Sequence, residues 1–519
     1  MTRATAIFGA VLLALGTLFL GSCSSQPPAA ENGAAAAPAG DDEGNGAPHP
    51  EQALLEDLTI ANRILARELG ILDIQGHTSV RSKADPNHWY MPRFVSPGGA
   101  AVGDMIEYDL DSKEVHGPRT DNAREIYLHG EIYKARPDVM AVVHAHTPEF
   151  VAFGMSSVPL YDGDMPLPVW DIRPFNRGRS GVVSTLALGT AMAEKMGKAE
   201  AVLLWGHGIA LGAASLPDAI ARVDALRDSA QLQQATIAIG GTWKPQPLPA
   251  KAEGAVERTW EHHKKAVLRA SGGKVPSSPE PTPEKPSDPD QATAHDVMLA
   301  NRILASDELR VLDTLGHVSL RNPRNPNSYF VAAGVAPGSV TRGDVKQRDI
   351  TKAEADTQNL SIDDEIYKAR PDVNAILYAR TPEIAAFTTG AAMLRPVVNG
   401  GAFIGNGLPM FSLPALDGRA VAEALGMARG VLLSGNGFVL TGGSIYNLVD
   451  QAYQLRQNAV IQRQVIGLRG RVSYLNERPA DPAPAGGRGG GGNQGQQAGP
   501  TGPPEGRSWI YWSQNVSLE

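Results

Sequence analysis

Three histidines have the types and spacing to hold a metal ion. His144 and His146 stand two apart around the apolar run 139–145, which predicts a strand with both imidazoles on one face. His207 lies between two glycines at a predicted turn between strands. Three neutral nitrogen donors with an open coordination position are typical of a catalytic zinc site. From the His-x-His pair alone, one exposed and one structurally satisfied histidine is an equally good interpretation.

Glu125 is the candidate for moving a proton at such a site. Glu125 and His129 are four apart, so they share one face of a helix predicted to begin near Asn122 and to end before Pro137. With Asn122 as N-cap, however, Glu125 occupies the third helical position, where a glutamate can complete a capping box. The residues alone leave both roles open.

The elements predicted around these residues alternate between helices and strands. Hydrophobic periodicity and turn residues predict helices over 58–69, 182–198 and, capped by Ser215, to about 239, and strands over 77–81, 89–94, 139–145, 201–204 and 209–211. Mixed elements of these lengths indicate a layered α/β domain.

Composition removes several classes of protein. The 519 residues carry 47 basic and 55 acidic side chains, a net charge of −8, which predicts no nucleic-acid partner. The one cysteine, Cys23, excludes an internal disulfide framework and a cysteine-rich metal site. Any metal ligands are therefore His, Asp or Glu, and 42% hydrophobic residues suffice for sizeable cores.

The N-terminal segment predicts export. Arg3 precedes an apolar run over 4–20 that is short for a membrane span, and Leu20-Gly21-Ser22-Cys23 follows. This arrangement resembles the lipobox of bacterial lipoproteins, which implies a lipidated Cys23 and a membrane anchor. Ser24 after it resembles outer-membrane sorting, with the protein facing the periplasm. An ordinary signal peptide that contains a cysteine is the alternative.

Low-complexity sequence divides the rest of the chain. After the signal peptide of 1–23 we expect a flexible tether at 24–50, a domain at 51–270, a Pro/Ser-rich linker at 271–291, a second domain at 292–478, a Gly/Pro-rich linker at 479–507 and an aromatic tail at 508–519. The two domains repeat one another, because residues 61–66 recur at 300–305 and residues 131–139 recur unchanged at 365–373. This pattern indicates a tandem duplication.

Several ordered motifs of the first domain resemble one family, the class II aldolase/adducin-type domain. They are Glu125-x3-His129, Ile132-Tyr133-x2-Arg136-Pro137-Asp138-Val139, His144-x-His146 and Gly206-His207-Gly208. The resemblance covers 58–240 and, in weakened form, 296–467. It implies two tandem three-layer α/β/α domains with mostly antiparallel central sheets. It further implies that His144, His146 and His207 bind a divalent ion, with zinc expected and manganese or cobalt as alternatives, and that Glu125 is a ligand or the general acid/base.

The substrate region departs from the sugar-phosphate aldolases of that family. At the place where those enzymes carry a Gly-Asn-x-Ser phosphate loop, this chain has Gly76-His77-Thr78-Ser79-x-Arg81. It looks more like the branch that includes hydroxylated aromatic-acid decarboxylases, in which His77 or Arg81 meets a carboxylate and His129 helps to orient the substrate. The alternative is a structural turn with a solvated salt bridge, which the recurrence of the motif at 316–321 supports.

These resemblances predict a metal-dependent carbon–carbon lyase. Its substrate is a small hydroxylated carbonyl or carboxylic acid, and its reaction is decarboxylation, aldol cleavage or epimerisation through an enolate-like intermediate. The alternative is a non-catalytic adducin-like binding or assembly module tethered to the membrane.

The second domain lacks the candidate ligands. Tyr378, Arg380 and Asn436 stand at the positions of the three histidines, and an ungapped count places Asn359 and Asp363 at those of Glu125 and His129. Arg380 would put a fixed cation where the metal sits, so we expect a metal-free pseudo-domain. It would pair with the first domain as a pseudo-dimer, and a higher homo-oligomer is expected. An anionic ligand for Arg380 is the weaker alternative.

The aromatic tail is apolar enough to dock on the fold. In related aldolases a C-terminal tyrosine covers the neighbouring site, which suggests Tyr511 as a lid. A strand or plug packed on the fold is the alternative.

Overall fold

The computed structural model describes residues 49–118, 125–176, 181–244, 254–352, 359–390, 392–412, 416–476 and 506–516. The expected signal peptide with Cys23, nearly all of the tether, the linker 479–507 up to its last two residues, and Asn122 lie outside the described residues. Residues from Pro50 onward form one structural unit, which contains both repeats.

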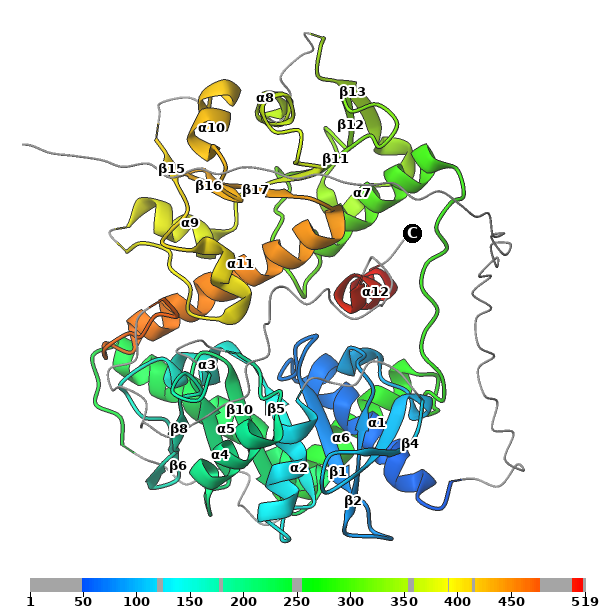
Figure 1. Ribbon diagram of the computed structural model, residues 1–519, viewed down its shortest axis with the longest axis vertical. Helices are drawn as coiled ribbons and strands as arrows, with labels where there is room; N and C mark the ends of the chain where they lie inside the picture. Colours follow the sequence, from blue (N-terminus) through cyan, green and yellow to red (C-terminus); the bar gives the residue numbers. More distant parts are fainter. Residues whose placement is uncertain are drawn as a thin grey trace, which may run out of the picture. The chain divides into compact units, whose positions relative to one another are not determined.

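The first repeat is built on an eight-stranded sheet in the order β4-β3-β2-β1-β5-β10-β9-β8 (Figure 1). Only the pair β8–β9 is parallel among its neighbours. The strands are β1 His77–Arg81, β2 His88–Pro92, β3 Met105–Asp109, β4 Glu114–His116, β5 Ala141–Ala145, β8 Val169–Trp170, β9 Ala201–Leu204 and β10 Gly208–Ala213, and β6 Tyr161–Asp162 pairs separately with β7 Met165–Pro166.

Helices cover both faces of this sheet, because successive residues of each strand alternate between two cores. Val143 packs in one core with α1, α3, α5 and α6, whereas Val142 packs in the other with α2 and α4. The helices are α1 Gln52–Arg63 with its π-helical extension Ile64–Glu68, α2 Ile126–Ala135, α3 Pro148–Gly154, α4 Leu186–Met196, α5 Leu216–Ala238 and α6 Ala255–Ala270. The predicted three-layer α/β/α architecture with a mostly antiparallel sheet is confirmed.

The second repeat has the same design around a seven-stranded sheet, β13-β12-β11-β14-β17-β16-β15. Its strands are β11 His317–Arg321, β12 Ser328–Val331, β13 Lys346–Asp349, β14 Ala375–Ala379, β15 Met410–Phe411, β16 Gly430–Leu433 and β17 Gly437–Gly442, and its helices are α7 Pro289–Ala305, α8 Leu360–Ala369, α9 Pro382–Thr389, α10 Gly418–Leu425 and α11 Ile445–Gly467. His317 pairs with Tyr378 just as His77 pairs with His144, so both repeats keep one strand register.

Most predicted elements form, with boundaries set by local capping. The strand at 77–81 and the helix capped by Ser215 match the prediction, and the Ser215 hydroxyl accepts from the N–H of Asp218. The helix expected from 182 begins at Leu186, because Thr185 caps it by accepting from Leu188. The helix expected near Asn122 begins, within the described residues, at Ile126.

Part of the expected linker 271–291 is tied to the first repeat. Glu280 forms ion pairs with Arg63 and Arg67 at 3.3 and 3.1 Å. Helix α7 starts at Pro289, a position that suits proline because the first N–H groups of a helix have no partner within the helix. The linker predicted from composition, 271–291, therefore includes the first turn of α7.

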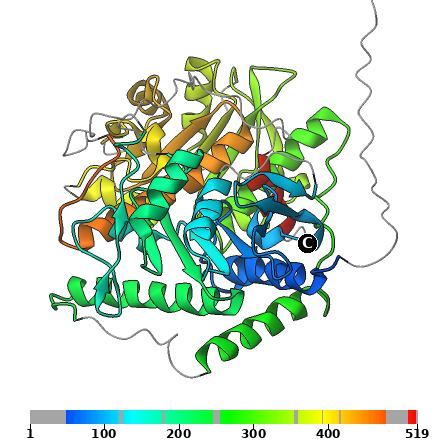
Figure 2. The same cartoon turned by 60° about the horizontal axis from the view of Figure 1, so that its bottom comes forward.

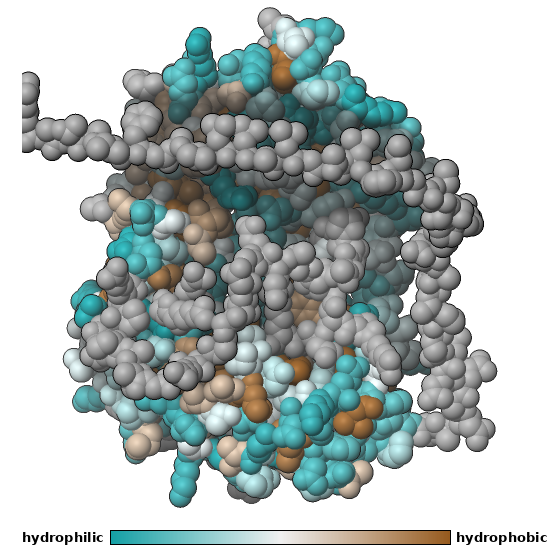
Figure 3. All heavy atoms as spheres, in the orientation of Figure 1, coloured by the Kyte–Doolittle hydropathy of each residue, from teal (hydrophilic) through white to brown (hydrophobic). Residues whose placement is uncertain are grey.

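The aromatic tail forms helix α12, Gly506–Asn515, rather than a strand. Trp509 and Trp512 are buried in the core of the second repeat, while Gly98 of the first repeat lies against the Tyr511 ring. Figures 1 and 2 show α12 in red where the two repeats meet. Among the described residues, no helix has both the length and the apolar character needed to span a membrane. On the face drawn in Figure 3, the described hydrophobic residues form small separate groups among hydrophilic ones.

Candidate functional site

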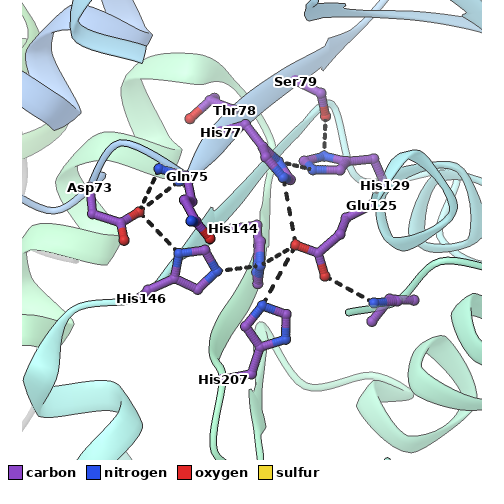
Figure 4. Close-up of polar contacts among 12 residues, drawn as sticks. Asp73, Gln75, His77, Thr78, Ser79, Glu125, His129, His144, His146 and His207 are labelled. Carbon is purple, nitrogen blue, oxygen red and sulfur yellow. Dashed lines mark hydrogen bonds and ion pairs between the residues drawn. The ribbon is translucent and has the colours of Figure 1, made fainter. Parts of the chain in front are cut away.

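Glu125, His144, His146 and His207 meet at one point beside the first sheet. One ligand-type atom from each lies within 4.8 Å of the others. Glu125 directly precedes α2, His144 and His146 stand at the end of β5, and His207 lies in the β9–β10 turn (Figure 4). That turn needs Gly206, which has a φ of +63°. Sequence positions up to 82 residues apart thus form one cluster of three imidazoles and one carboxylate.

The hydrogen bonds of two histidines fix which nitrogen faces the cluster. His144 donates through Nδ1 to the carbonyl of Ile209 at 2.9 Å, and His146 donates through Nδ1 to Asp73 Oδ1 at 3.0 Å. Their Nε2 atoms face each other at 2.9 Å. In the neutral tautomers both carry lone pairs there, so they require a proton or a cation. Two nitrogens on one tetrahedral zinc at about 2.0–2.1 Å stand only slightly farther apart, so the donor set fits such an ion.

Asp73 is a part of the site that sequence reasoning missed. Its Oδ1 accepts from the N–H groups of Gln75 and Gly76 as well as from His146. Burial alone lowers the pKa of His146, but Asp73 more than offsets this and raises it above its usual value. A carboxylate behind a histidine fixes its tautomer and increases its basicity as a ligand. An Asp-x-x-Gly turn before β1 was the available signal, but nothing in the sequence links it to a histidine 73 residues later.

Glu125 is surrounded by the histidines rather than placed in a capping box. It precedes the first residue of α2, not the third helical position, and its Oε2 lies 3.2 Å from His144 Nε2 and 3.6 Å from His207 Nε2. Oε1 accepts from the N–H of Val183 at 2.9 Å. Burial raises the pKa of Glu125, but His207 and His144 more than offset it and hold the pKa well below its usual value. The carboxylate is therefore ionised at neutral pH and can act as a base.

His77 lies beside the cluster, whereas His129 supports it from behind. His77 Nε2 is 3.9 Å from Glu125 Oε2, and its Nδ1 is 2.8 Å from His129 Nε2. His129 Nδ1 in turn meets Ser79 Oγ at 2.6 Å. Burial lowers the pKa of His129 to about 3, so the ring is neutral. His129 is fully buried and lies behind His77, and its role in orienting the substrate stays a prediction.

Arg81 does not face the cluster, so its assignment as a substrate contact is corrected. Its guanidinium donates to the carbonyls of Val139, Tyr133 and Arg136 at 3.0, 2.6 and 3.1 Å, and stacks on the Tyr133 ring. Arg321 makes the same set of contacts in the second repeat. A structural role explains why the contacts of Arg81 and Arg321 are the same. The expected solvated salt bridge is not what forms, because each guanidinium is held by backbone carbonyls.

The second repeat holds a different set of groups at the matching place. Asp363 contacts His317 at 2.7 Å and Ser319 at 2.8 Å, as His129 contacts His77 and Ser79. The Tyr378 hydroxyl donates to Asn436 at 3.2 Å. The counted alignment is therefore confirmed. Arg380 is exposed, so it does not put a buried cation in the place of a metal.

A cavity of about 570 Å³ opens on the cluster. His146 and His207 line it on the side of the first repeat. Residues of α11 and of 398–400, where a 3₁₀ helix begins at Asn399, line it on the side of the second repeat, and Tyr511 and Asn515 of α12 also line it. The volume suits a small organic molecule.

The chain belongs to the Class II Aldolase and Adducin N-terminal domain family, which matches residues 56–234 and again 295–463. The two matched regions are the two repeats. Both the predicted family and the tandem duplication are thus confirmed.

Three curated relatives each match one repeat's length of chain. The decarboxylase NovR of Streptomyces niveus is 31% identical over 212 residues, covering 39% of this chain and 76% of that protein. The 3,4-dihydroxyphthalate decarboxylase of Arthrobacter keyseri is 30% identical over 213 residues, covering 38% and 84%. The 4-hydroxy-3-prenylphenylpyruvate oxygenase/4-hydroxy-3-prenylbenzoate synthase of Streptomyces roseochromogenus subsp. oscitans is 32% identical over 200 residues, covering 37% and 70%. The family and its relatives identify a class II aldolase-like lyase.

Proposed function

We propose that the first repeat is a zinc-dependent decarboxylase of small hydroxylated carboxylic acids, aromatic acids foremost. The observation that carries the proposal is the cluster of Glu125, His144, His146 and His207, in which the Nε2 atoms of His144 and His146 lie 2.9 Å apart. The decarboxylase relatives favour loss of CO₂ over aldol cleavage. Zinc fits three imidazoles better than it fits any ligand set of the second repeat.

The residues divide the work of such a reaction. His144, His146 and His207 would hold the ion, which supplies a Lewis acid for the substrate hydroxyl oxygen. Ionised Glu125 takes the proton of that hydroxyl when the substrate binds. Glu125 then delivers this proton to the ring carbon that carries the carboxylate, and that carbon binds it with an electron pair of the phenolate π system. The bond from this carbon to the carboxylate breaks, CO₂ leaves, and the bonding pair restores the aromatic phenolate, so atoms and charge balance.

His77 would steer the substrate during this exchange. Its Nε2 faces the same space as Glu125, and His129 with Ser79 fixes its orientation. A neutral imidazole there can hydrogen-bond a carboxylate or hydroxyl without competing for the metal.

Metal content tests the proposal directly. The protein lacking residues before Ser24 should retain about one zinc per chain, and the His144→Ala/His146→Ala variant should retain none. The matched variant Tyr378→Ala/Arg380→Ala alters the same strand of the second repeat and should keep the zinc. Release of CO₂ from 3,4-dihydroxyphthalate and a panel of hydroxylated benzoates then tests the reaction. A wild-type protein that takes up no metal would instead support a non-catalytic adducin-like module.

We further propose that the chain is exported and lipid-anchored through Cys23, on the outer membrane facing the periplasm. The apolar run over 4–20 followed by Gly21-Ser22-Cys23 supports this. In bacterial cells fed an alkyne fatty acid, the wild type should become labelled and sediment with membranes, whereas Cys23→Ser should remain unlabelled. Equal labelling of both proteins would refute the anchor.

We also propose a homo-oligomer beyond the pseudo-dimer of repeats. Ile461 and Leu468 of the second repeat are buried in the first core at 2% exposure. Counted from the caps Ser215 and Ser444, the matching Leu232 and Ile239 are 55% and 87% exposed. A second copy could cover them. Light scattering should find a dimer that Leu232→Asp/Ile239→Asp dissociates, and a monomeric wild type would refute this.

A further inference from the structure

The metal-free repeat lies directly over the site of the first repeat. Helix α11 packs on α3, which begins two residues after His146. Ile461 and Val465 of α11, and Leu468 directly after it, are buried in the core of the first repeat. This apolar contact places the preceding turns of α11 along the cavity that opens on His146 and His207.

The cavity-facing turns of α11 carry uncharged polar groups. Tyr453, Gln454 and Gln457 line the cavity, and the Tyr453 hydroxyl hydrogen-bonds Gln457. Counted from the two helix caps, the matching residues of α5 are Asp224, Ala225 and Asp228. Helix α11 therefore presents neutral donors and acceptors where α5 of the first repeat carries two carboxylates, while Asp307 and Glu308 of the second repeat also line the cavity.

This wall of the cavity is held in place by specific contacts. Asn458 accepts from the N–H of Val397 at 2.8 Å and donates to the carbonyl of Arg395 at 2.8 Å, which fixes the neighbouring loop against α11. Gln454 lies against Gly400, where any side chain would collide with it. A preorganised wall loses little entropy when a ligand binds.

Among the described residues that line the cavity, Arg67 is the one arginine or lysine, and it donates to the carbonyl of Gly98 and pairs with Glu280 at 3.1 Å. Phosphate recognition by a protein normally uses an available Arg, Lys or helix N-terminus. The lining favours hydroxyl groups on the part of the substrate that lies away from the metal.

We propose that α11 of the metal-free repeat is the substrate-recognition wall of the first repeat's site, and that Tyr453, Gln454 and Gln457 select an unphosphorylated hydroxy acid by hydrogen-bonding its distal hydroxyls. The inference rests on the proposed function, because it takes the cluster to be the reacting centre. It gives the second repeat a binding role without a metal of its own.

A charge swap at Gln457 tests this wall. In the zinc-loaded protein, calorimetry should show that Gln457→Asp weakens binding of 3,4-dihydroxybenzoate about tenfold, whereas Gln457→Lys strengthens it, because a wall charge acts on the anionic ligand across a poorly screened cavity. Gln464 lies on the same helix and does not line the cavity, so Gln464→Asp and Gln464→Lys should leave the affinity unchanged. Zinc content should be the same in all five proteins.

The outcomes separate this inference from the proposed function. Equal affinities for Gln457→Asp and Gln457→Lys, or no binding by the wild type, would refute the role of α11 in substrate recognition. Binding with the expected charge dependence but no release of CO₂ would support that role and refute decarboxylation. A tighter affinity for a phosphorylated hydroxy acid, such as 4-phosphoerythronate over erythronate, would overturn the selection against phosphate.

Discussion

At the scale of single residues, the site depends on a carboxylate that no motif marks. Asp73 holds His146 at 3.0 Å and is itself held by two backbone N–H groups. We expect Asp73→Asn to weaken zinc binding roughly 10–100-fold, because a neutral amide supports the imidazole less well. Competition with a chromophoric chelator measures the affinity.

The duplication provides a matched control for this prediction. Asp313 accepts from the N–H groups of Leu315 and Gly316 as Asp73 accepts from those of Gln75 and Gly76, but Arg380 stands at the position that matches His146. Asp313→Asn should therefore disturb an identical turn and leave zinc affinity unchanged. If both variants lose zinc equally, Asp73 acts only through the fold.

Arg81 illustrates the opposite case, a residue with polar chemistry and a structural role. Its guanidinium satisfies several backbone carbonyls of the α2–β5 connection. Arg81→Gln should lower the free energy of unfolding by roughly 2–4 kcal/mol, since charged buried hydrogen bonds are lost. Urea unfolding measures this. Zinc content and KM of the folded fraction should not change, and a selective rise in KM would restore a substrate role.

The residues of the cluster were predictable only in part. The spacing of the three histidines indicated a metal site, and the family resemblance added Glu125, whose role the residues alone left open. The structure brings these four residues together. It misplaced Arg81, because a polar side chain looks the same in sequence whether it faces a cavity or a buried carbonyl. Asp73 was missed because its contact with His146 depends on how a turn and a strand end come together.

At the scale of elements, the crossing of α2 and α4 sets the position of Glu125. Gly189 of α4 lies against Tyr127 of α2, and a Cβ there would overlap the Tyr127 carbonyl oxygen. Gly189→Ala should destabilise the protein by roughly 1–3 kcal/mol through overpacking, despite alanine's better helix propensity. It should also reduce zinc affinity, because α2 begins one residue after Glu125.

The equivalent crossing in the second repeat distinguishes the two effects. Gly418 of α10 lies against the carbonyl of Ser361 in α8 in the same way. Gly418→Ala should therefore destabilise by a similar amount, measured by thermal unfolding, with no change in zinc affinity. A loss of zinc in this variant would show that general destabilisation, rather than the position of α2, controls the metal.

The types of most helices and strands could be predicted from hydrophobic periodicity and capping residues, whereas the helical conformation of the tail could not. Strands β1 and β9 and helix α5 form where apolar spacing and Ser215 predict them. The tail became helix α12 because Trp509 and Trp512 face one core. An isolated ten-residue helix is marginal in water, so only tertiary packing stabilises it.

At the scale of the whole molecule, α12 joins elements that are distant in the sequence. It contacts α7 and α11, Trp512 donates to Glu308, and Gln514 donates to the carbonyl of Glu280. Tyr511 lines the cavity. This arrangement agrees with a tail that packs on the fold. The role of Tyr511 as a lid remains a prediction, and it requires that truncation before Gly506 alters turnover.

The docking of α12 gives the molecule a pH dependence with a definite sign. Ser508 of α12 donates to Asp450 on α11, and burial raises the pKa of Asp450 above its usual value. Between the unfolded and folded pKa values the folded state therefore binds more protons than the unfolded state. Stability contributed by this group falls as pH rises through that window, and below the unfolded pKa no penalty exists.

Asp450→Asn should remove this dependence while keeping an oxygen that accepts from Ser508. The variant and the wild type should unfold with similar free energies near pH 4, and the variant should become the more stable of the two as pH rises toward 7. Denaturant titrations followed by tryptophan fluorescence measure the unfolding, and Trp509 and Trp512 of α12 are two of the seven tryptophans that contribute to the signal. Parallel pH profiles for the two proteins would contradict the prediction, and Ser508→Ala controls for the hydrogen bond alone. Because α12 contributes Tyr511 to the cavity, a shift in its docking with pH would also reach the site.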